Sequence, residues 1–328
     1  MMDKGSGRNL GERVLRHEVT PVFSVLLVFM IVVSIMSPHF MRFQNINSVF
    51  QNLSIVGMVT MGMGLVMISG GIDLSVGWMM SLCGSSVAYM MVNLGLPEGL
   101  AFVLGLLLGM ALGTIMGFII ASTKIEPFII SLGFMSAYQG ITYIITGARE
   151  IKLQPEMFTA LGKTRIFNIG SPVYFFVILT AILWLLLKYT RFGRRLYAVG
   201  GNADAAYLAG INVRLFKMGI YTINGFIVSF ASMVYVSRLG TGSPLIGLNA
   251  EIDAIAAVVV GGVAMKGGKG NMWGVFIGVV LLAFISNALN LMGISPFYQY
   301  LLKGVLIVGS VLISYHGGIR SQSSKSKA

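Results

Sequence analysis

The sequence predicts an all-α polytopic membrane protein with about ten transmembrane helices. Hydrophobic residues make up 56% of the 328 residues and charged residues only 10%, whereas a soluble domain carries roughly 25% charged residues. Apolar runs of about 20 residues, the length that crosses a bilayer as a helix, follow one another along nearly the whole chain. Little of the chain is left for a soluble domain.

Ten apolar runs are expected to form these helices in order. The eighth is short and rich in Ala, Val and Gly, so it is expected to cross half of the membrane or to be enclosed by protein. The connection over 147–171 contains Pro155 and several charges, and either a long loop or a short surface helix fits it. The approximate limits of the ten runs are 21–37, 49–70, 75–92, 99–121, 127–146, 172–188, 216–237, 251–265, 271–292 and 297–315.

The distribution of basic residues predicts the orientation. If the N-terminus is cytoplasmic, 16 of the 23 Lys and Arg residues fall on the cytoplasmic side, where basic residues are favoured. Both termini are therefore expected inside, and the first apolar run, which no small-residue cleavage site follows, is expected to be retained. The predicted parts are a cytoplasmic segment 1–20, a transmembrane domain 21–315 with a cytoplasmic connection at about 189–215, and a cytoplasmic tail 316–328.

Composition also argues against several classes of protein. The net charge of +12 does not indicate a nucleic-acid partner, because the basic residues lie in short loops and tails, where they set orientation. Cys83 is the only cysteine, which excludes an internal disulfide and a multi-cysteine zinc site. The three histidines lie in or beside termini and loops without metal-site spacing, so no metal is expected in this chain.

The run from Gly70 to Gly77 (Gly-Gly-Ile-Asp-Leu-Ser-Val-Gly) places a carboxylate and a hydroxyl between two apolar runs. Such groups are costly near lipid and are usually functional, and the glycines let the backbone break there. One interpretation places these acidic residues near a translocation pathway or its gates; the other has their carboxylates cap the helices that follow. The candidates are Gly71, Asp73, Ser75, Gly77, Glu251 and Asp253.

Short matches between the two halves suggest an inverted internal repeat. Ile72-Asp73 and Ile252-Asp253 each precede a span rich in small residues, and Glu126-Pro127-Phe128 and Ser295-Pro296-Phe297 each open the last span of a half. The span count places the two Asp residues on opposite sides, as in inverted-repeat transporters. Chance similarity between apolar segments is the alternative.

Small and aromatic residues mark helix faces. Glycines recur every fourth residue from Gly105 to Gly117, a pattern that allows close helix packing. Aromatic and hydroxyl side chains open the fifth and tenth spans at helical spacing. Lining a pathway through the membrane is one role for them, and helix packing is the alternative. The candidates are Phe128, Ser131, Phe134, Phe297 and Tyr300.

The connection after the sixth span contains a short helix signal. Asn202 is a good N-cap, Asp204 lies in the first turn, and Gly210 suits the end of the helix. A helix this short is unstable alone, so it is either an ordinary loop helix or an element that docks on a partner. Its residues are Asn202, Ala203, Asp204, Ala205, Ala206, Tyr207, Leu208, Ala209 and Gly210.

Several ordered blocks carry a family resemblance. They are Gly71 to Gly77, Glu126-Pro127-Phe128-Ile129, Arg191-Phe192-Gly193 through Gly210-Ile211, and Glu251 through Gly262. Over about residues 20–315 the chain resembles the membrane permease subunit of bacterial ABC importers for simple sugars, the group of the ribose, galactose, xylose and autoinducer-2 systems. The resemblance implies a type II-like permease with about ten helices in the cytoplasmic (inner) membrane.

The resemblance also implies partners: a second permease subunit, most simply in a homodimer, a cytoplasmic ABC ATPase and an extracytoplasmic sugar-binding protein, with membrane lipid around the permease. The connection at about 189–215 would be the cytoplasmic coupling region, and its 202–210 helix would be the coupling helix that docks on the ATPase. ATP and Mg would bind to the ATPase, and this chain would bind no cofactor. Its nearest P-loop candidate, around Gly268-Lys269, has Val263 where the motif requires the first Gly and Gly270 where it requires Ser or Thr.

Three other functions compete with an ABC permease. In an ion-coupled secondary transporter of a small polar solute, Asp73 and Asp253 would be coupling groups. A membrane enzyme would need a nucleophile with a base or a metal, and Ser75 has no nearby His; the chain is therefore not expected to be an enzyme. A purely structural scaffold leaves the docking sequence without a role.

Overall fold

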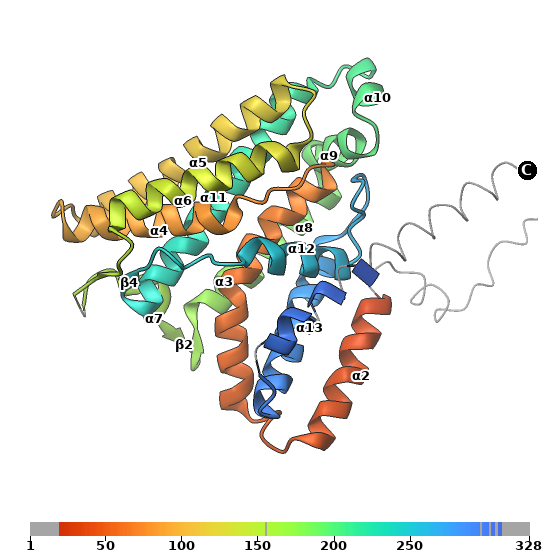
Figure 1. Ribbon diagram of the computed structural model, residues 1–328. Coiled ribbons are helices and arrows are strands. Elements are labelled where there is room, and N and C mark those ends of the chain that lie inside the picture. Colours follow the sequence, from red (N-terminus) through yellow and green to blue (C-terminus); the bar gives the residue numbers. More distant parts are fainter. Residues whose placement is uncertain (1–19, 155, 296, 302, 306–307, 310–328) are drawn as a thin grey trace, which may run out of the picture.

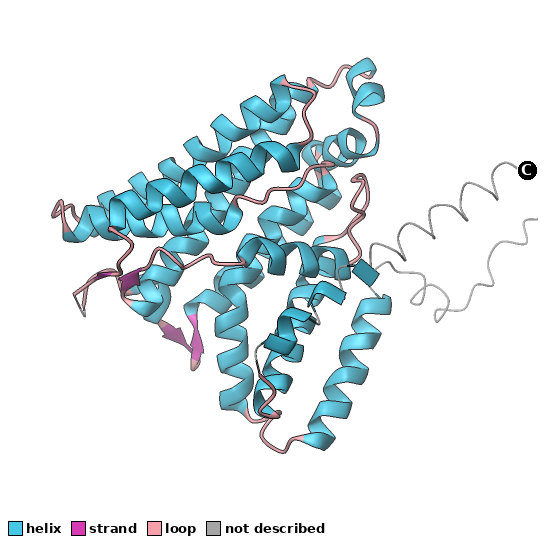
Figure 2. Ribbon diagram, in the orientation of Figure 1, coloured by secondary structure: helices cyan, strands magenta, loops and turns pink. Residues whose placement is uncertain are grey.

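The computed structural model describes residues 20–309 apart from 155, 296, 302, 306 and 307. Nearly all of the predicted N-terminal segment, the C-terminal tail and the end of the tenth predicted span lie outside the described residues. Helices dominate, and Figure 2 shows strands only in one small region. The long helices are α2 (Thr20–Met36), α3 (Phe43–Ile68), α4 (Val76–Val92), α5 (Glu98–Ser122), α6 (Pro127–Thr146), α8 (Ser171–Tyr189), α11 (Val213–Leu239) and α13 (Met272–Leu291).

Helices lie at nine of the ten predicted spans, and residues of the tenth are helical where they are described. Within the described residues, six helices are long and apolar enough to cross a membrane: α3, α5, α6, α8, α11 and α13. The apolar helices α2 and α4 have 17 residues each, and α12 (Ala250–Val260) has 11. The chain therefore has the build of an integral membrane protein.

The connection at 147–171 has more structure than the sequence predicts. It contains the four-residue helix α7 (Ala160–Lys163) and three two-residue strands, β1 (Ile151–Lys152), β2 (Arg165–Ile166) and β3 (Ile169–Gly170). Strand β1 pairs with β4 (Thr241–Gly242), directly after α11, and β2 pairs with β3. The expectation of an all-α chain thus misses these short antiparallel pairs, whose two-residue strands leave no periodic signal.

The glycine stripe of α5 packs as predicted. Gly105, Gly109, Gly113 and Gly117 are all buried, and α5 lies along α11, as Figure 1 shows. A Cβ added at Gly113 would lie 2.2 Å from the carbonyl oxygen of Tyr221. Only glycine permits this approach of the two backbones.

Two helices end within the fold, and the chain turns back after each. Helix α3 ends at Ile68, and the non-helical segment 69–75 leads to α4; α11 ends at Leu239, and segment 240–249 leads to α12. We call these two segments the first break and the second break. The second break approaches the first turn of α4, directly after the first break: an added Cβ on Gly247 would lie 1.9 Å from the Gly77 carbonyl oxygen. The Gly247 N–H also donates to Ser81 Oγ at 3.0 Å.

Candidate functional site

The first break is organised around the Asp73 carboxylate. Asp73 is fully buried, and its Oδ1 accepts hydrogen bonds from the Ser75 N–H at 2.9 Å and the Ser75 hydroxyl at 2.6 Å. Its Oδ2 accepts from Asn224 Nδ2, in the middle of α11, at 2.8 Å. Asp73 thus binds Ser75, the N-cap residue of α4, and ties the break to α11, whereas α4 itself has no side-chain cap hydrogen bond.

Ser131 of α6 also holds the first break. Its buried hydroxyl accepts from the Leu74 N–H at 3.1 Å and lies 3.0 Å from the carbonyl oxygen of Phe128. The break is therefore fastened on two sides, by α11 through Asp73 and by α6 through Ser131.

The aromatic pathway candidates do not converge on the first break. Phe134 packs on Tyr138 with ring centroids 5.5 Å apart, whereas Phe128, Phe297 and Tyr300 are exposed on the surface of the chain. The structure thus brings only Ser131 of the five candidates to the Asp73 segment.

Gly71 in the first break and Gly77 in the first turn of α4 allow close contacts. An added Cβ at Gly71 would lie 2.5 Å from the Tyr221 hydroxyl, and one at Gly77 would lie 2.3 Å from Glu251 Oε2. The two acidic blocks singled out in the sequence are therefore neighbours. Glu251 Oε2 is buried without a hydrogen-bond partner among the described residues.

Asp253 has a different role from the capping role considered for it. Helix α12 begins at Ala250, three residues earlier, so Asp253 lies within its first turn. Its Oδ1 pairs with Lys303 Nζ at 2.5 Å. Asp253 therefore ties α12 to the last described helical segment.

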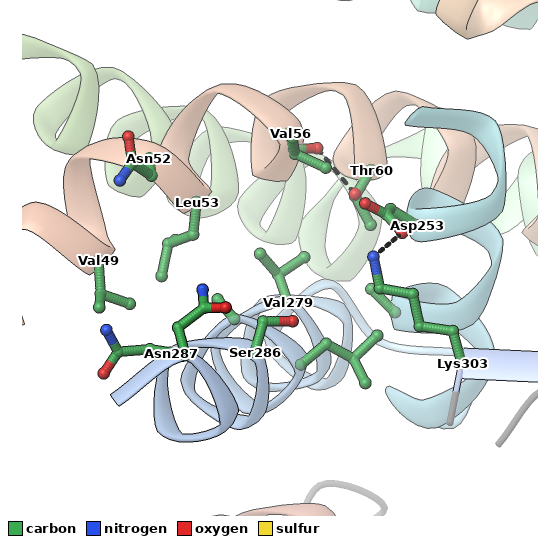
Figure 3. Close-up of a pocket in the computed structure, with 14 residues that line it drawn as sticks. Val49, Asn52, Leu53, Val56, Thr60, Asp253, Val279, Ser286, Asn287 and Lys303 are labelled. Carbon is green, nitrogen blue, oxygen red and sulfur yellow. Dashed lines mark hydrogen bonds and ion pairs between the residues drawn. The ribbon is translucent and has the colours of Figure 1, made fainter. Parts of the chain in front are cut away.

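This ion pair lies at one end of a cavity of about 300 Å³ between α3, α12 and α13 (Figure 3). Asn52, Ser286, Asn287 and Asn290 line it towards the start of α3 and the end of α13, and Thr60 lies beside Asp253. The walls between are valine, leucine and alanine side chains. In the described residues no cluster of three or more His, Cys, Asp and Glu side chains is suited to hold a metal ion.

The predicted short helix is present as α10 (Ala203–Leu208). The Asn202 side chain accepts from the Ala205 N–H at 2.9 Å, and Gly210 has the left-handed conformation, φ +82°, as expected of the N-cap and the terminating glycine. Ala206 is buried, but Tyr207 is 70% and Leu208 85% exposed. Figure 1 shows α10 at the edge of the molecule, beside α9 (Arg191–Gly201).

Helix α9 joins α10 to the first break through backbone contacts. An added Cβ at Gly200 would lie 1.9 Å from the carbonyl oxygen of Ile68, the last residue of α3. The same oxygen accepts from the Gly268 N–H at 2.8 Å, and Gly267 lies against Gly70 and Gly200. We call these residues (Ile68, Gly70, Gly200, Gly267 and Gly268) the glycine junction.

Three partners of the candidate residues were not predicted from the sequence. Asn224, a lone amide in the apolar seventh span, had a detectable signal, since polar groups at membrane depth usually have a partner. Tyr221 and Lys303 also lie in or beside apolar runs. Nothing in the sequence spacing shows that Tyr221 lies beside Gly71 or that Lys303 pairs with Asp253.

Comparisons with known proteins agree with the described architecture. The family described as branched-chain amino acid transport system / permease component matches residues 45–311. The chain is 41% identical to the ribose import permease protein RbsC of Bacillus subtilis, covering 89% of this chain and 91% of that one, and 37% identical to its Haemophilus influenzae counterpart, covering 91% and 93%.

A third relative is the L-arabinose transport system permease protein AraH of Escherichia coli, 36% identical over 88% of each chain. No solved structure matches the chain. Because the matches span nearly the whole chain on both sides, the chain belongs to this family of transport-system permease components.

Proposed function

We propose that the chain is the transmembrane permease subunit of an ATP-driven ABC importer for a simple sugar, a ribose-like pentose or a hexose. The observation that carries this proposal is the 36–41% identity, over about nine-tenths of the chain, to permeases named for ribose and L-arabinose import. The sugar is captured by an external binding protein, so the permease itself needs only to favour different pathway conformations in different nucleotide states.

The proposed topology has ten helices in two inverted halves. Two similar arrangements support it: α3, the first break and α4 in one half, and α11, the second break and α12 in the other. Helices α3 and α11 run in opposite directions, because Ile68 at the end of α3 and Val213 at the start of α11 lie on the α9–α10 side. The α9–α10 side is then cytoplasmic, with both termini, segments 1–20 and 316–328 included, inside.

The proposed partners follow from the same division of labour. Two permease subunits form a homodimer in the inner membrane, and ATP and Mg bind the ATPase. Residues 202–210 dock on the ATPase, with Tyr207 and Leu208 as the apolar contacts. Movement of α10 reaches α9 and then, through the glycine junction, the first break with Asp73.

The gating and pathway roles belong to this proposal too. Gly71, Ser75 and Gly77 shape the first break, and Glu251 and Asp253 lie where the second break becomes α12. The exposed aromatic side chains of Phe128, Phe297 and Tyr300 are available to face the second subunit or the pathway. Ser131 and Phe134 of α6 are the other two pathway candidates. An ion-coupled transporter gains no support from the relatives, which are named as permeases of sugar import or transport systems.

Reconstitution with the cognate ATPase and binding protein tests the proposed function. Vesicles with ATP inside and the binding protein outside are expected to accumulate labelled D-ribose, L-arabinose or a related sugar, and vesicles without ATP are not. Uptake that needs an ion gradient but no ATP, together with failure of any ATPase to copurify, would contradict the proposal.

A double substitution tests the docking role of α10. Tyr207→Ala with Leu208→Ala removes two exposed side chains and leaves the helix cap intact, so the permease is expected to assemble normally. ATP-dependent uptake should fall at least about tenfold, because truncating an apolar side chain in the core of an interface costs about 1–2 kcal/mol. The measurement is uptake together with copurification of the ATPase.

Leu94→Ala is the matched control, because Leu94 is also exposed but follows α4 at the opposite end of the helices. Its uptake should equal that of the wild type. Equal uptake by all three proteins would show that α10 is an ordinary loop helix.

A further inference from the structure

We propose that the cavity between α3, α12 and α13 is a binding site for a polyhydroxyl solute, the transported sugar itself, within the membrane domain. The inference rests on the proposed function, since it takes the sugar as cargo and the α3 N-terminal side as the outer side. It adds a site to a chain whose sugar capture is otherwise assigned to an external protein.

The position of the polar groups gives the cavity a direction. Asn52, Ser286 and Asn290 lie near the first turns of α3 and the last turns of α13, at the outer rim. Asp253 and Lys303 lie at the inner end with Thr60, and Figure 3 shows the rim and this floor separated by apolar walls. A solute from the outer side therefore meets amides first and the ion pair last.

The groups at the floor retain unused hydrogen-bonding capacity. Within the described residues, Lys303 Nζ uses one of its three hydrogens on Asp253 Oδ1, and Asp253 Oδ2 accepts no hydrogen bond. The Thr60 hydroxyl beside them gives its hydrogen to the Val56 carbonyl oxygen at 2.8 Å and is fully buried, so Asp253 and Lys303 are the groups that a solute can reach. Donors and acceptors thus stand side by side, which suits a hydroxyl group because it both donates and accepts.

The amide groups at the rim also use only part of their hydrogen-bonding capacity. Asn52 Oδ1 accepts from Arg238 Nη2 at 2.9 Å, and Asn290 Oδ1 accepts from Gln299 Nε2 at 2.7 Å. Neither Nδ2 group has a partner in the part of the chain that the structure describes. Asn287, by contrast, exchanges two hydrogen bonds with Asn45 and serves to join α13 to α3. The rim offers mainly donors, and the floor adds the acceptors.

The charge and size of the site favour a neutral solute. The carboxylate and the ammonium group neutralise each other, so the floor has no net charge to attract an ion. A volume of about 300 Å³ lies at the lower end of the range for small-molecule sites. The valine and leucine walls can contact the C–H faces of a sugar ring, while its hydroxyls reach the two polar ends.

Cysteine protection tests the site in the complete transporter. Ser286→Cys is made in a Cys83→Ala background, which removes the one native thiol. A membrane-impermeant methanethiosulfonate reagent should label residue 286. D-ribose should slow labelling about tenfold at about ten times its dissociation constant, since only the unoccupied site reacts. The same osmolarity of glycine betaine, which has no hydroxyl group, should have no effect.

Met292→Cys is the matched control, since Met292 is exposed just beyond α13 and does not line the cavity. Its labelling should not respond to ribose. If residue 286 is inaccessible, or reacts at the same rate with ribose while uptake of ribose proceeds, the inference is wrong. Absence of ATP-driven uptake in the wild type is a separate outcome, which overturns the proposed function itself.

Discussion

Gly200→Ala is expected to destabilise the permease strongly and to abolish uptake. The added methyl group would lie 1.9 Å from the Ile68 carbonyl oxygen and 2.7 Å from the Gly268 N atom. Both obstacles are backbone atoms, so no side chain can rotate away. The cost is expected at or above the upper end of the about 1–3 kcal/mol typical of overpacking. Thermal unfolding of the purified protein in detergent measures it.

The adjacent Gly201 provides the control. A Cβ at Gly201 meets nothing within 4 Å, and both glycines lie at the end of the same helix, α9. Gly201→Ala should therefore retain the melting temperature and the uptake of the wild type. If both variants behave alike, the tight contact at the glycine junction does not exist.

Asp73→Ala is expected to have the second large effect. It leaves the Asn224 amide and the Ser75 N–H without their acceptor in a fully buried place, and it leaves the Ser75 hydroxyl only the Met116 sulfur at 3.4 Å, a weak acceptor. Each buried polar group without a partner costs about 1–3 kcal/mol, so a loss of about 3 kcal/mol or more is expected. The measurement is the yield of monodisperse protein together with its melting temperature.

Asp73→Asn separates shape from charge. Asn at position 73 keeps an oxygen that accepts from Ser75. If the Asn224 amide rotates by about 180°, its Oδ1, which has no partner among the described residues, can accept from the new Nδ2. We expect assembly close to that of the wild type, with a loss below about 1 kcal/mol, and near-normal uptake. Normal assembly without uptake would instead show that the charge of Asp73 takes part in transport.

Much of the helical layout could be predicted from the sequence. Apolar runs of the right length predict α3, α5 and α11, because lipid requires nearly continuous apolar surface over a fixed length. The Asn202 cap and Gly210 predict α10, because capping depends on residues a few positions apart. Local signals thus identified both the short helix and the place of the first break.

The partners across the fold could not be predicted in the same way. Asp73 and Asn224 are 151 positions apart, and no local pattern encodes which helix faces which. The pair of Asp253 with Lys303 depends on how α12 turns after the second break. Sequence spacing places Asp253 before a helix, whereas the helix begins three residues earlier and leaves the carboxylate free to pair with Lys303.

The burial of α3 has a consequence for the biosynthesis of the chain. Helix α3 is synthesised early, yet it packs on α8, α11, α12 and α13, which are all synthesised later. Until these later helices are inserted, the small and polar residues of α3, such as Ser54, Thr60 and Gly64, lack their native neighbours. Insertion and packing are therefore separated in time for this helix, and a nascent chain that stops before Ala250 presents an unfinished α3 surface to membrane chaperones and proteases.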